Sequence, residues 1–159
     1  VIPKVAALAA KEHGDARKAI DILRYSGEIA DEHDDDRVRV EYVDEAHERE
    51  EEARLAELIG KQPEHSKYLL QGLALQMQQS TDTDAMIPSK QVYSAYEVVC
   101  EREGTDPLKI RRVRDLLSEL AFLSLIEQNR KGRGNGKGAH TVNQLVDAPE
   151  LIIEACKSA

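Results

Sequence analysis

The sequence predicts a mainly α-helical chain with one small β-hairpin, and the main evidence lies between residues 105 and 146. Apolar residues recur there at steps of three and four, as on the buried side of a helix: Ile110, Val113, Leu117 and Leu120. A basic, glycine-rich stretch follows at 129–138, and residues 140–146 then alternate between polar and apolar, as in a half-buried strand. A basic amphipathic helix followed by two strands that a basic glycine loop joins is the pattern of a winged helix.

Two helices are predicted at the start of the chain. The first covers residues 5–10 and ends near Gly14. The second begins after Asp15, whose carboxylate can accept a hydrogen bond from a free N–H group of the first turn. The predicted buried side of this second helix comprises Ala16, Ala19, Ile20 and Leu23.

Arg17 lies in the first turn of that second helix, where the helix dipole disfavours a cation. It is interpreted either as a surface arginine offset by Asp21 four residues later, or as an arginine held there to meet an anion. The local residues alone favour the surface arginine.

The middle of the chain is predicted to contain a charged helix. Residues 38–43 alternate and are compatible with a short extended segment, after which Asp44 can cap a helix that runs to about Ile59. Its thinner apolar side consists of Ala46, Ala53, Ala56 and Ile59. Gly60 stands where a left-handed C′ residue usually ends a helix, and the segment 60–63 is the predicted domain boundary.

Three further helices are predicted after that boundary. The first begins at Pro63 and buries Leu69, Leu70, Leu73, Ala74 and Met77. The second is capped by Ser89, ends at Gly104 and buries Val92, Tyr96, Val99 and Cys100. Asp106 and Pro107 begin the third, since aspartate caps helices and proline suits the first turn. A last helix starts at about Pro149, after the two strands.

Charge is distributed unevenly along the 159 residues. The net charge is −8, yet residues 105–140 contain eight Lys and Arg against four Asp and Glu, whereas the remainder contains fourteen against twenty-six. Because an acidic protein is repelled by nucleic acid, a basic segment confined to one motif is informative. Acidic runs such as 34–36 and 50–52 are typical of solvated surfaces.

The third helix of a three-helix set is the recognition helix in helix-turn-helix proteins, and here it contains Arg111, Arg112 and Arg114. Arginine can read guanine edges or clamp phosphates. A solvated basic face is the alternative, and many winged helices bind only proteins.

The glycine-rich stretch favours DNA, because its cations alternate with glycines: Arg130, Lys131, Arg133 and Lys137. Glycine lets the backbone approach a groove closely, and flexible cations can follow phosphates. Asn135 is interpreted either as a wing-tip residue that touches a minor-groove edge or as a plain turn residue. A nucleotide-binding phosphate loop is excluded, since Lys137 is followed by Gly138 and then a strand rather than by Ser or Thr and a helix.

Other functions find no support in the sequence. The two cysteines, Cys100 and Cys156, lack metal-ligand spacing and are predicted to be reduced core residues. The five histidines form no cluster, so no metal site is expected, and no catalytic set of residues is visible. No apolar run reaches the roughly 20 residues of a membrane span, so no membrane partner is expected. Two cysteines are too few for a disulfide framework, which favours a cytoplasmic setting, and DNA binding would make the protein nucleoid-associated.

Six segments, taken together in their order, resemble the archaeal replication initiators of the origin recognition and cell-division-control family, which are AAA+ proteins. These segments are 14–17 (GDAR), 19–23 (AIDIL), 43–46 (VDEA), 92–96 (VYSAY), 107–120 (PLKIRRVRDLLSEL) and 132–134 (GRG). The resemblance spans nearly the entire chain. It implies that residues 1–60 are the C-terminal part of an AAA+ helical lid with its linker helix, and that residues 61–159 are a winged-helix DNA-binding domain.

For the nucleotide, the resemblance implies that Arg17 is the second-sensor arginine, which approaches the γ-phosphate of ATP. This reverses the interpretation from the local residues. The sequence lacks Walker A and Walker B segments and an apolar helix pattern begins almost at Val1, so we expect a fragment that is not itself an enzyme. No cofactor is expected for the fragment, whereas the intact parent would bind ATP or ADP with Mg.

For DNA, the resemblance implies a recognition helix in the major groove and a wing at the minor groove. The residues that match these parts are Lys109, Arg111, Arg112, Arg114, Arg130, Lys131, Arg133, Asn135 and Lys137. The implied partners are origin duplex DNA, the replicative helicase and other initiator subunits. A winged-helix transcription regulator and a winged-helix protein-interaction module remain the alternatives.

Overall fold

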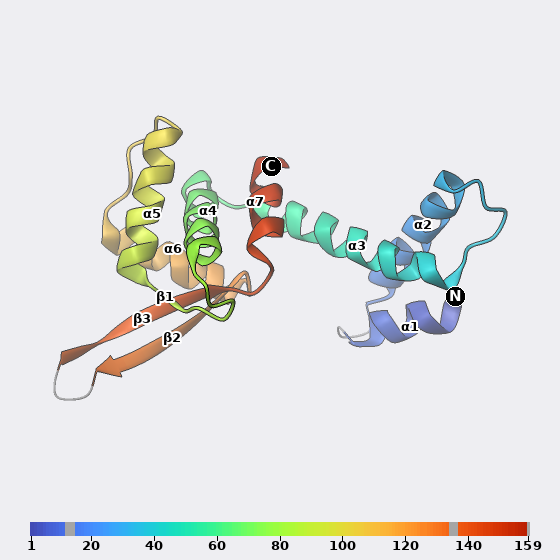
Figure 1. Ribbon diagram of the computed structural model, residues 1–159, viewed down its shortest axis with the longest axis horizontal. Coiled ribbons are helices and arrows are strands. Elements are labelled where there is room, and N and C mark those ends of the chain that lie inside the picture. The colour runs from blue at the N-terminus through green and yellow to red at the C-terminus, as the bar shows by residue number, and fades with distance from the viewer. Residues whose placement is uncertain (12–14, 134–136, 159) are drawn as a thin grey trace. The chain divides into compact units, whose positions relative to one another are not determined.

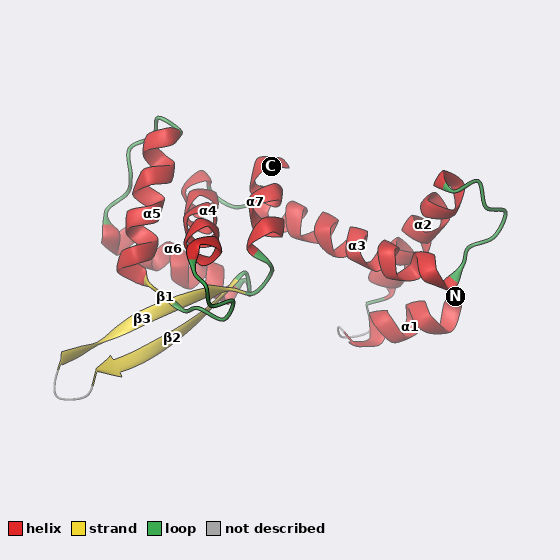
Figure 2. Ribbon diagram, in the orientation of Figure 1, coloured by secondary structure: helices red, strands yellow, loops and turns green. Residues whose placement is uncertain are grey.

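The computed structural model describes residues 1–11, 15–133 and 137–158, with residues 133 and 137 described for their backbone only. Within these residues lie seven helices and a three-stranded antiparallel sheet (Figures 1 and 2). The mainly α-helical class with a small sheet is the one that the sequence predicts.

The first compact unit, Val1–Leu55, contains α1 (Ile2–Lys11), α2 (Ala16–Glu32) and most of α3 (Val40–Gly60). Its core brings these three helices together through Val5, Ile22, Ile29, Val43 and Ala46. The second unit, Ala56–Ala159, begins within α3. The predicted domains, 1–60 and 61–159, stay predictions.

Helix α2 starts as predicted but buries a different side. The Asp15 carboxylate accepts the Arg17 N–H at 2.9 Å, which confirms the cap. The predicted buried residues are partly or largely exposed, with Ile20 at 64% and Leu23 at 36%. The side that is buried comprises Lys18, Ile22, Ser26, Ile29 and Ala30. The prediction of the buried side was wrong, because local spacing does not reveal that Lys18 pairs with Glu50 of α3 and so lies on the buried side.

Helix α3 begins four residues before the predicted cap, at Val40. Asp35, in the preceding loop, accepts hydrogen bonds from Arg39 and from the Tyr42 hydroxyl and so supports the first turn. Asp44 is therefore a helical residue, and its carboxylate pairs with Lys4 of α1 at 2.6 Å.

Gly60 is the last residue of α3 rather than a left-handed residue beyond it. Among the glycines in the described part of the chain, a positive φ is found at Gly104.

The second unit contains the sheet and four further helices. Its elements are α4 (Glu64–Gln79), β1 (Ile87–Pro88), α5 (Ser89–Arg102), α6 (Ile110–Phe122), β2 (Ile126–Arg133), β3 (Lys137–Leu145) and α7 (Pro149–Ser158). The strand order is β1-β3-β2 with antiparallel pairing. Figure 1 shows β2 and β3 reaching beyond the helices of this unit as a long hairpin. All residues predicted to be buried on α4 and α5 are buried.

The backbones of α4 and α5 approach each other closely at Gly72. A Cβ atom at this position would lie 2.9 Å from the backbone nitrogen of Tyr96. The contact therefore requires glycine on α4 and fixes α5, which carries the tyrosines described below, against the core.

Strand β1 was not predicted, and it changes the role of Ser89. Its two residues pair with β3, Ile87 with Asn143 and Pro88 with Val142. The buried Asn143 amide donates to Ile87 O and to Ser89 Oγ, and its oxygen accepts from Gln128 of β2. The Ser89 hydroxyl thus accepts a hydrogen bond from Asn143 on the central strand β3. Ser89 is the first residue of α5 rather than its cap.

Two helices of the second unit end in a Schellman motif. At the end of α5, Gly104 has a φ of 68°, and Thr105 N–H donates to Cys100 O. At the end of α6, Ser124 takes the same left-handed conformation with a φ of 60°, and Leu125 N–H donates to Leu120 O. The chain therefore turns sharply from α6 into β2, which places the wing beside the helix.

Candidate nucleic-acid interface

Helix α6 packs its apolar side into the second unit and presents its arginines outward. The side chains of Val113, Leu116, Leu117 and Leu120 are each at most 2% exposed. Arg111, Arg112 and Arg114 are exposed, and so is Lys109, the N-cap residue. The predicted apolar stripe is confirmed, except that Ile110 is only half-buried and Leu116 joins it.

The segment before α6 is held by two tyrosine side chains of α5. Leu108 N–H donates to the Tyr96 hydroxyl oxygen at 2.8 Å, and Leu108 O accepts the Tyr93 hydroxyl at 2.9 Å. Because both backbone groups of Leu108 are engaged in this way, the helix begins only at Ile110. The prediction that Asp106 caps the helix is wrong for this reason.

Tyr96 is the buried centre of this arrangement, with a side chain that is 0% exposed. Its hydroxyl also lies 2.8 Å from Nδ1 of His65 on α4. Since the oxygen accepts the Leu108 N–H, its own proton is available for the imidazole nitrogen. Burial raises the pKa of Tyr96 to about 12, so the hydroxyl retains that proton at neutral pH.

The two ends of the outward side of α6 differ in chemistry. The first turns carry the arginines, whereas the later turns carry Asp115, Glu119 and Phe122. Glu119 Oε1 lies 3.7 Å from Arg112. Phe122 is 89% exposed and lies about three turns after Arg111, which places both on the same side of the helix. A basic end and an acidic, aromatic end therefore share one helix face.

The strands of the wing are longer than the sequence predicts. Residues 129–133 and 137–138, expected in the loop, belong to β2 and β3, because Arg130 pairs with Thr141 and Lys131 with His140. Both Arg130 and Lys131 are exposed. Successive residues of a strand point to opposite faces, so the wing presents a cation on each face.

The far end of the wing is described only in part. Arg133 ends β2 and pairs in register with Lys137, which begins β3, and the register shifts between Lys131 and Arg133. The prediction for Asn135 lies outside the described residues.

Arg17 belongs to the first compact unit and is exposed in the first turn of α2. Its neighbour Lys18 is buried, with Nζ 3.4 Å from Glu50 and 3.7 Å from Glu51, both on α3. Asp21, the predicted partner of Arg17, lies 3.6 Å from Arg24.

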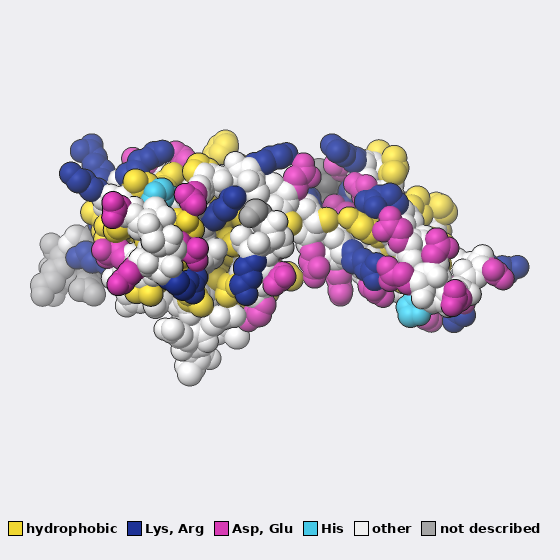
Figure 3. Space-filling model, turned by 90° about the horizontal axis from the view of Figure 1, so that it is seen from above, with side chains coloured by type: hydrophobic (Ala, Val, Ile, Leu, Met, Phe, Trp, Pro, Cys, Tyr) yellow, Lys and Arg dark blue, Asp and Glu magenta, His cyan; other side chains and the backbone are white. Residues whose placement is uncertain are grey.

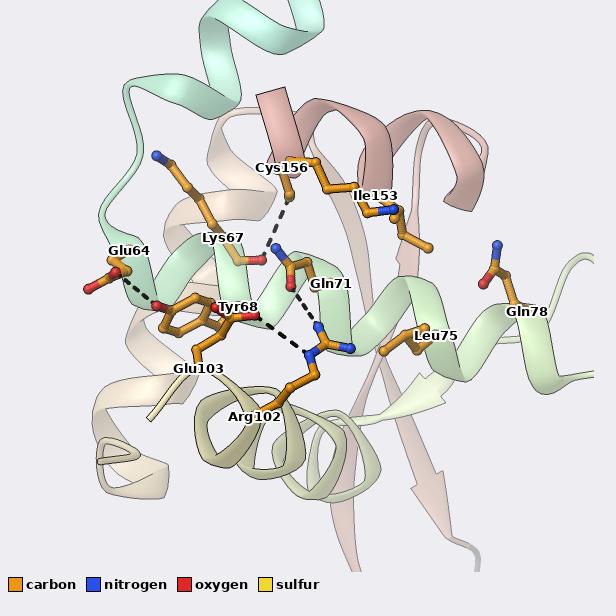
Figure 4. Close-up of a pocket in the computed structure, with 11 residues that line it drawn as sticks. Glu64, Lys67, Tyr68, Gln71, Leu75, Gln78, Arg102, Glu103, Ile153 and Cys156 are labelled. Atoms are coloured by element: carbon orange, nitrogen blue, oxygen red, sulfur yellow. Dashed lines mark hydrogen bonds and ion pairs between the residues drawn. The ribbon is translucent and has the colours of Figure 1, made fainter. Parts of the chain in front are cut away.

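A groove of the second unit runs along α4 between the end of α5 and α7 (Figure 4). Arg102 crosses its floor and bonds Gln71 at 3.4 Å, with Glu103 at 3.6 Å. At the α4 side, Tyr68 donates its hydroxyl to Glu64 at 2.8 Å. Cationic, anionic and amide side chains all line the groove, so it offers a mixed surface rather than a site for one kind of ion.

Surface charge on the face drawn in Figure 3 does not single out a further site. On the face in Figure 3, Lys and Arg side chains lie intermixed with Asp and Glu. Over the described ranges, no three His, Cys, Asp or Glu side chains are placed to hold a metal ion. None of the helices in the described part of the chain is long and apolar enough to cross a membrane.

Sequence reasoning missed the residues that hold α6 and the residue that ends it. Tyr93 and Tyr96 lie within the VYSAY segment, but hydrogen bonds to a backbone 15 and 12 positions away leave no periodic signal. Phe122 lies two residues after Leu120, the last residue of the predicted apolar stripe. Its position on the arginine side of the helix, at 100° per residue, was the available signal.

Two family models match this chain. Residues 57–155 match the CDC6 C-terminal winged-helix domain, and residues 1–48 match the Cdc6 AAA+ ATPase-type lid domain.

Curated relatives are archaeal. ORC1-type DNA replication protein 9 of Haloarcula marismortui is 42% identical over 154 residues, which cover 97% of this chain and 37% of the relative. ORC1-type DNA replication protein 1 of Archaeoglobus fulgidus is 39% identical over 153 residues, which cover 96% of this chain and 36% of the relative. The chain thus spans little more than a third of the length of these relatives.

The structure is also similar to solved structures. The Aeropyrum pernix ORC1 protein in complex with DNA matches with a TM-score of 0.77 and 32% identity, over 99% of this chain and 40% of that protein. Drosophila ORC bound to DNA matches with a TM-score of 0.53 and 24% identity, over 96% of this chain and 37% of that one. The second likeness concerns the fold alone.

Proposed function

This chain belongs to the CDC6 and ORC1-type family of DNA replication proteins and comprises the C-terminal lid and winged helix of such a protein. From that premise we propose that its winged helix binds duplex DNA through α6 and the wing. The observation that carries the proposal is the set of exposed cations at the start of α6 and on β2, within one compact unit of an otherwise acidic protein.

The start of α6 suits the major groove. An α-helix fits that groove, and the residues near its N-terminus are the ones that reach base edges in helix-turn-helix proteins. Arg111 and Arg114 are exposed there, and Lys109 precedes them at the N-cap. The helix N-terminus adds partial positive charge toward phosphates.

The wing suits the backbone or the adjacent groove. Arg130 and Lys131 project from opposite faces of an exposed hairpin, so that at least one cation faces the duplex in either orientation of the wing. Arg133, Asn135 and Lys137 are proposed to extend this contact, as the family resemblance implies. The similar structure of the Aeropyrum pernix ORC1 protein is itself a complex with DNA.

The test is a fluorescence-anisotropy titration of origin-like and scrambled duplexes at several salt concentrations. One variant combines Arg111→Ala with Arg112→Ala, and another combines Arg130→Ala with Lys131→Ala. Each is expected to weaken binding about tenfold or more and to lower the salt dependence, because each lost phosphate contact removes about one counterion from the slope.

The matched control combines Arg37→Ala with Arg54→Ala, which removes two exposed cations from the first unit. It is expected to leave the affinity nearly unchanged. Equal losses in the control and in the two variants, or no binding by wild type at low salt, would overturn the proposal.

For the intact parent we propose origin recognition, cooperation with other initiator subunits and support of helicase loading, with ATP or ADP and Mg bound by the longer protein. The exposed Arg17 guanidinium fits a sensor of nucleotide phosphate, since Asp15 caps the turn and Lys18 is fixed against α3. The remaining nucleotide ligands would come from the ATPase domain of the longer protein.

The far end of α6 supports a second candidate function, a contact with another initiator subunit. Phe122 is 89% exposed and stands near Asp115 and Glu119, whose carboxylates are repelled by phosphates. Phe122→Ala is expected to leave the affinity for duplex within twofold while it weakens association of subunits on a longer duplex, measured by sedimentation velocity. A loss of duplex affinity as large as that of Arg111→Ala would assign Phe122 to the DNA face instead.

A further inference from the structure

We propose that Tyr93 and Tyr96 are positioning residues for duplex binding, because they hold Leu108 and thereby set where α6 presents its arginines. Neither hydroxyl is proposed to touch DNA. The inference rests on the proposed function of α6, and its experiment separates the two.

The two tyrosine hydroxyls form an anchor for Leu108, the residue from which the chain enters α6. Leu108 lies three residues before Arg111. Its N–H donates to the Tyr96 hydroxyl at 2.8 Å, and its carbonyl accepts the Tyr93 hydroxyl at 2.9 Å. Two hydrogen bonds to one peptide residue fix both the position and the direction of the chain as it enters α6. A single hydrogen bond would leave the segment free to pivot.

The tyrosines are carried by an immobile part of the core. They stand three residues apart on α5, which places them on one face of that helix. Tyr96 is completely buried, and its backbone nitrogen is the atom closest to Gly72 of α4. His65 of α4 orients the Tyr96 hydroxyl from the other side. The anchor is thus built on α4 and α5 together.

Besides the tyrosines, the first turn of α6 is held by the half-buried Ile110 and by the hydrogen bond from Val113 N–H to Lys109 O at 3.1 Å. Its N-cap residue, Lys109, makes no side-chain capping bond, and the helix has no acidic residue in its first turn. The apolar residues from Val113 onward hold the later turns. The Tyr93 and Tyr96 hydroxyls therefore supply the side-chain hydrogen bonds that hold the chain as it enters the basic end of α6, whereas apolar packing holds its later turns.

The experiment is a set of double-mutant cycles on duplex affinity, measured by fluorescence anisotropy with this chain. The backgrounds are wild type, Tyr93→Phe and Tyr96→Phe, and each receives Arg111→Ala or Arg130→Ala. Ser94→Ala is the matched control, since it removes a hydroxyl of α5 that bonds Lys90 O and not Leu108. The rate of hydrogen exchange of the Leu108 amide measures directly whether its hydrogen bond to Tyr96 is formed.

We expect each Tyr→Phe variant to weaken binding about three- to tenfold without any change in charge. In those backgrounds Arg111→Ala should lose most of its effect, because its contact is already misplaced, whereas Arg130→Ala on the wing should keep its full effect. Exchange of the Leu108 amide should accelerate in Tyr96→Phe, and Ser94→Ala should match wild type in every measurement.

Two outcomes would overturn the inference and leave the proposed function intact: Tyr→Phe variants that bind like wild type, or variants in which Arg111→Ala keeps its full effect. If neither arginine substitution weakens binding by the wild-type protein, the proposed function fails instead. If Tyr96→Phe does not fold, the Tyr93→Phe variant, at a half-buried position, still tests the inference.

Discussion

Lys18 Nζ lies 3.4 Å from Glu50 Oε2, and this ion pair between α2 and α3 is almost completely shielded from solvent, with side-chain exposures of 5% and 8%. Buried charges are costly unless they are paired, so each of these residues depends on the other. The pair therefore fixes how α2 is rotated about its axis and leaves its neighbour Arg17 on the exposed side.

Replacing one partner of this pair is expected to destabilise the first unit strongly. Lys18→Met leaves the Glu50 carboxylate buried without its cation, at a cost of about 3 kcal/mol in the free energy of unfolding. Urea denaturation followed by circular dichroism measures this, and Lys18→Met combined with Glu50→Leu should recover much of the loss. The exposed pair of Lys4 and Asp44 is the comparison, where Lys4→Met should cost less than about 1 kcal/mol. Equal effects at the two pairs would contradict the argument.

Gly72→Ala is expected to destabilise the second unit by about 2 kcal/mol, because the new methyl group would meet the backbone of Tyr96 at 2.9 Å and force α4 and α5 apart. Thermal unfolding gives the size of the effect. Gly27→Ala provides the control: it lies inside α2 with no atom within 4 Å of the added group, so it should stabilise by about 0.5–1 kcal/mol. A neutral Gly72→Ala would show that the two helices can separate at no cost.

Ser124→Gly is expected to stabilise the protein by about 1 kcal/mol. Ser124 has a φ of 60°, a conformation that costs a residue with a side chain roughly 1–2 kcal/mol, and glycine avoids most of this cost. Ser118→Gly, within α6, should have the opposite sign, since glycine is a poor helix former. Both are read from the midpoint of thermal unfolding, and a Ser124→Gly variant that melts earlier than wild type would count against the assigned conformation.

Alkaline pH is expected to unfold the second unit partly through Tyr96. The pKa of this side chain in the folded protein is about 12, above the ordinary value of 10, because burial disfavours the phenolate. The neutral hydroxyl therefore contributes its full stabilisation below pH 10, and about 2–3 kcal/mol is lost as the pH rises from 10 to 12. Urea denaturation between pH 9 and 11 measures the slope, and Tyr96→Phe should flatten it. An unchanged slope in Tyr96→Phe would assign the alkaline loss to other groups.

Periodicity and turn chemistry predicted much of the fold. The stripe from Val113 to Leu120, the buried sides of α4 and α5, and the Asp15 cap all follow from local spacing, and the structure confirms them. The resemblance to archaeal initiators is also confirmed.

Three of the differences from the sequence prediction share one physical cause, which is contact between residues far apart in the sequence. Lys18 reads as a surface residue until Glu50 is placed beside it. Strand β1 is only two residues long and exists because β3 lies next to it. Asp106 reads as a helix cap until the tyrosines of α5 engage Leu108. Of the candidate site, the sequence predicts which side of α6 is basic, but not what holds its beginning.

The engagement of Leu108 also bears on how this protein tolerates changes in length. Surface loops usually absorb inserted or deleted residues, and the segment around Ser80–Asp84 is expected to do so. The segment between Gly104 and Lys109 is different, because one residue added there would disturb the two hydrogen bonds that hold Leu108 at the entry to α6. The length of this short connection therefore affects how α6 presents its arginines.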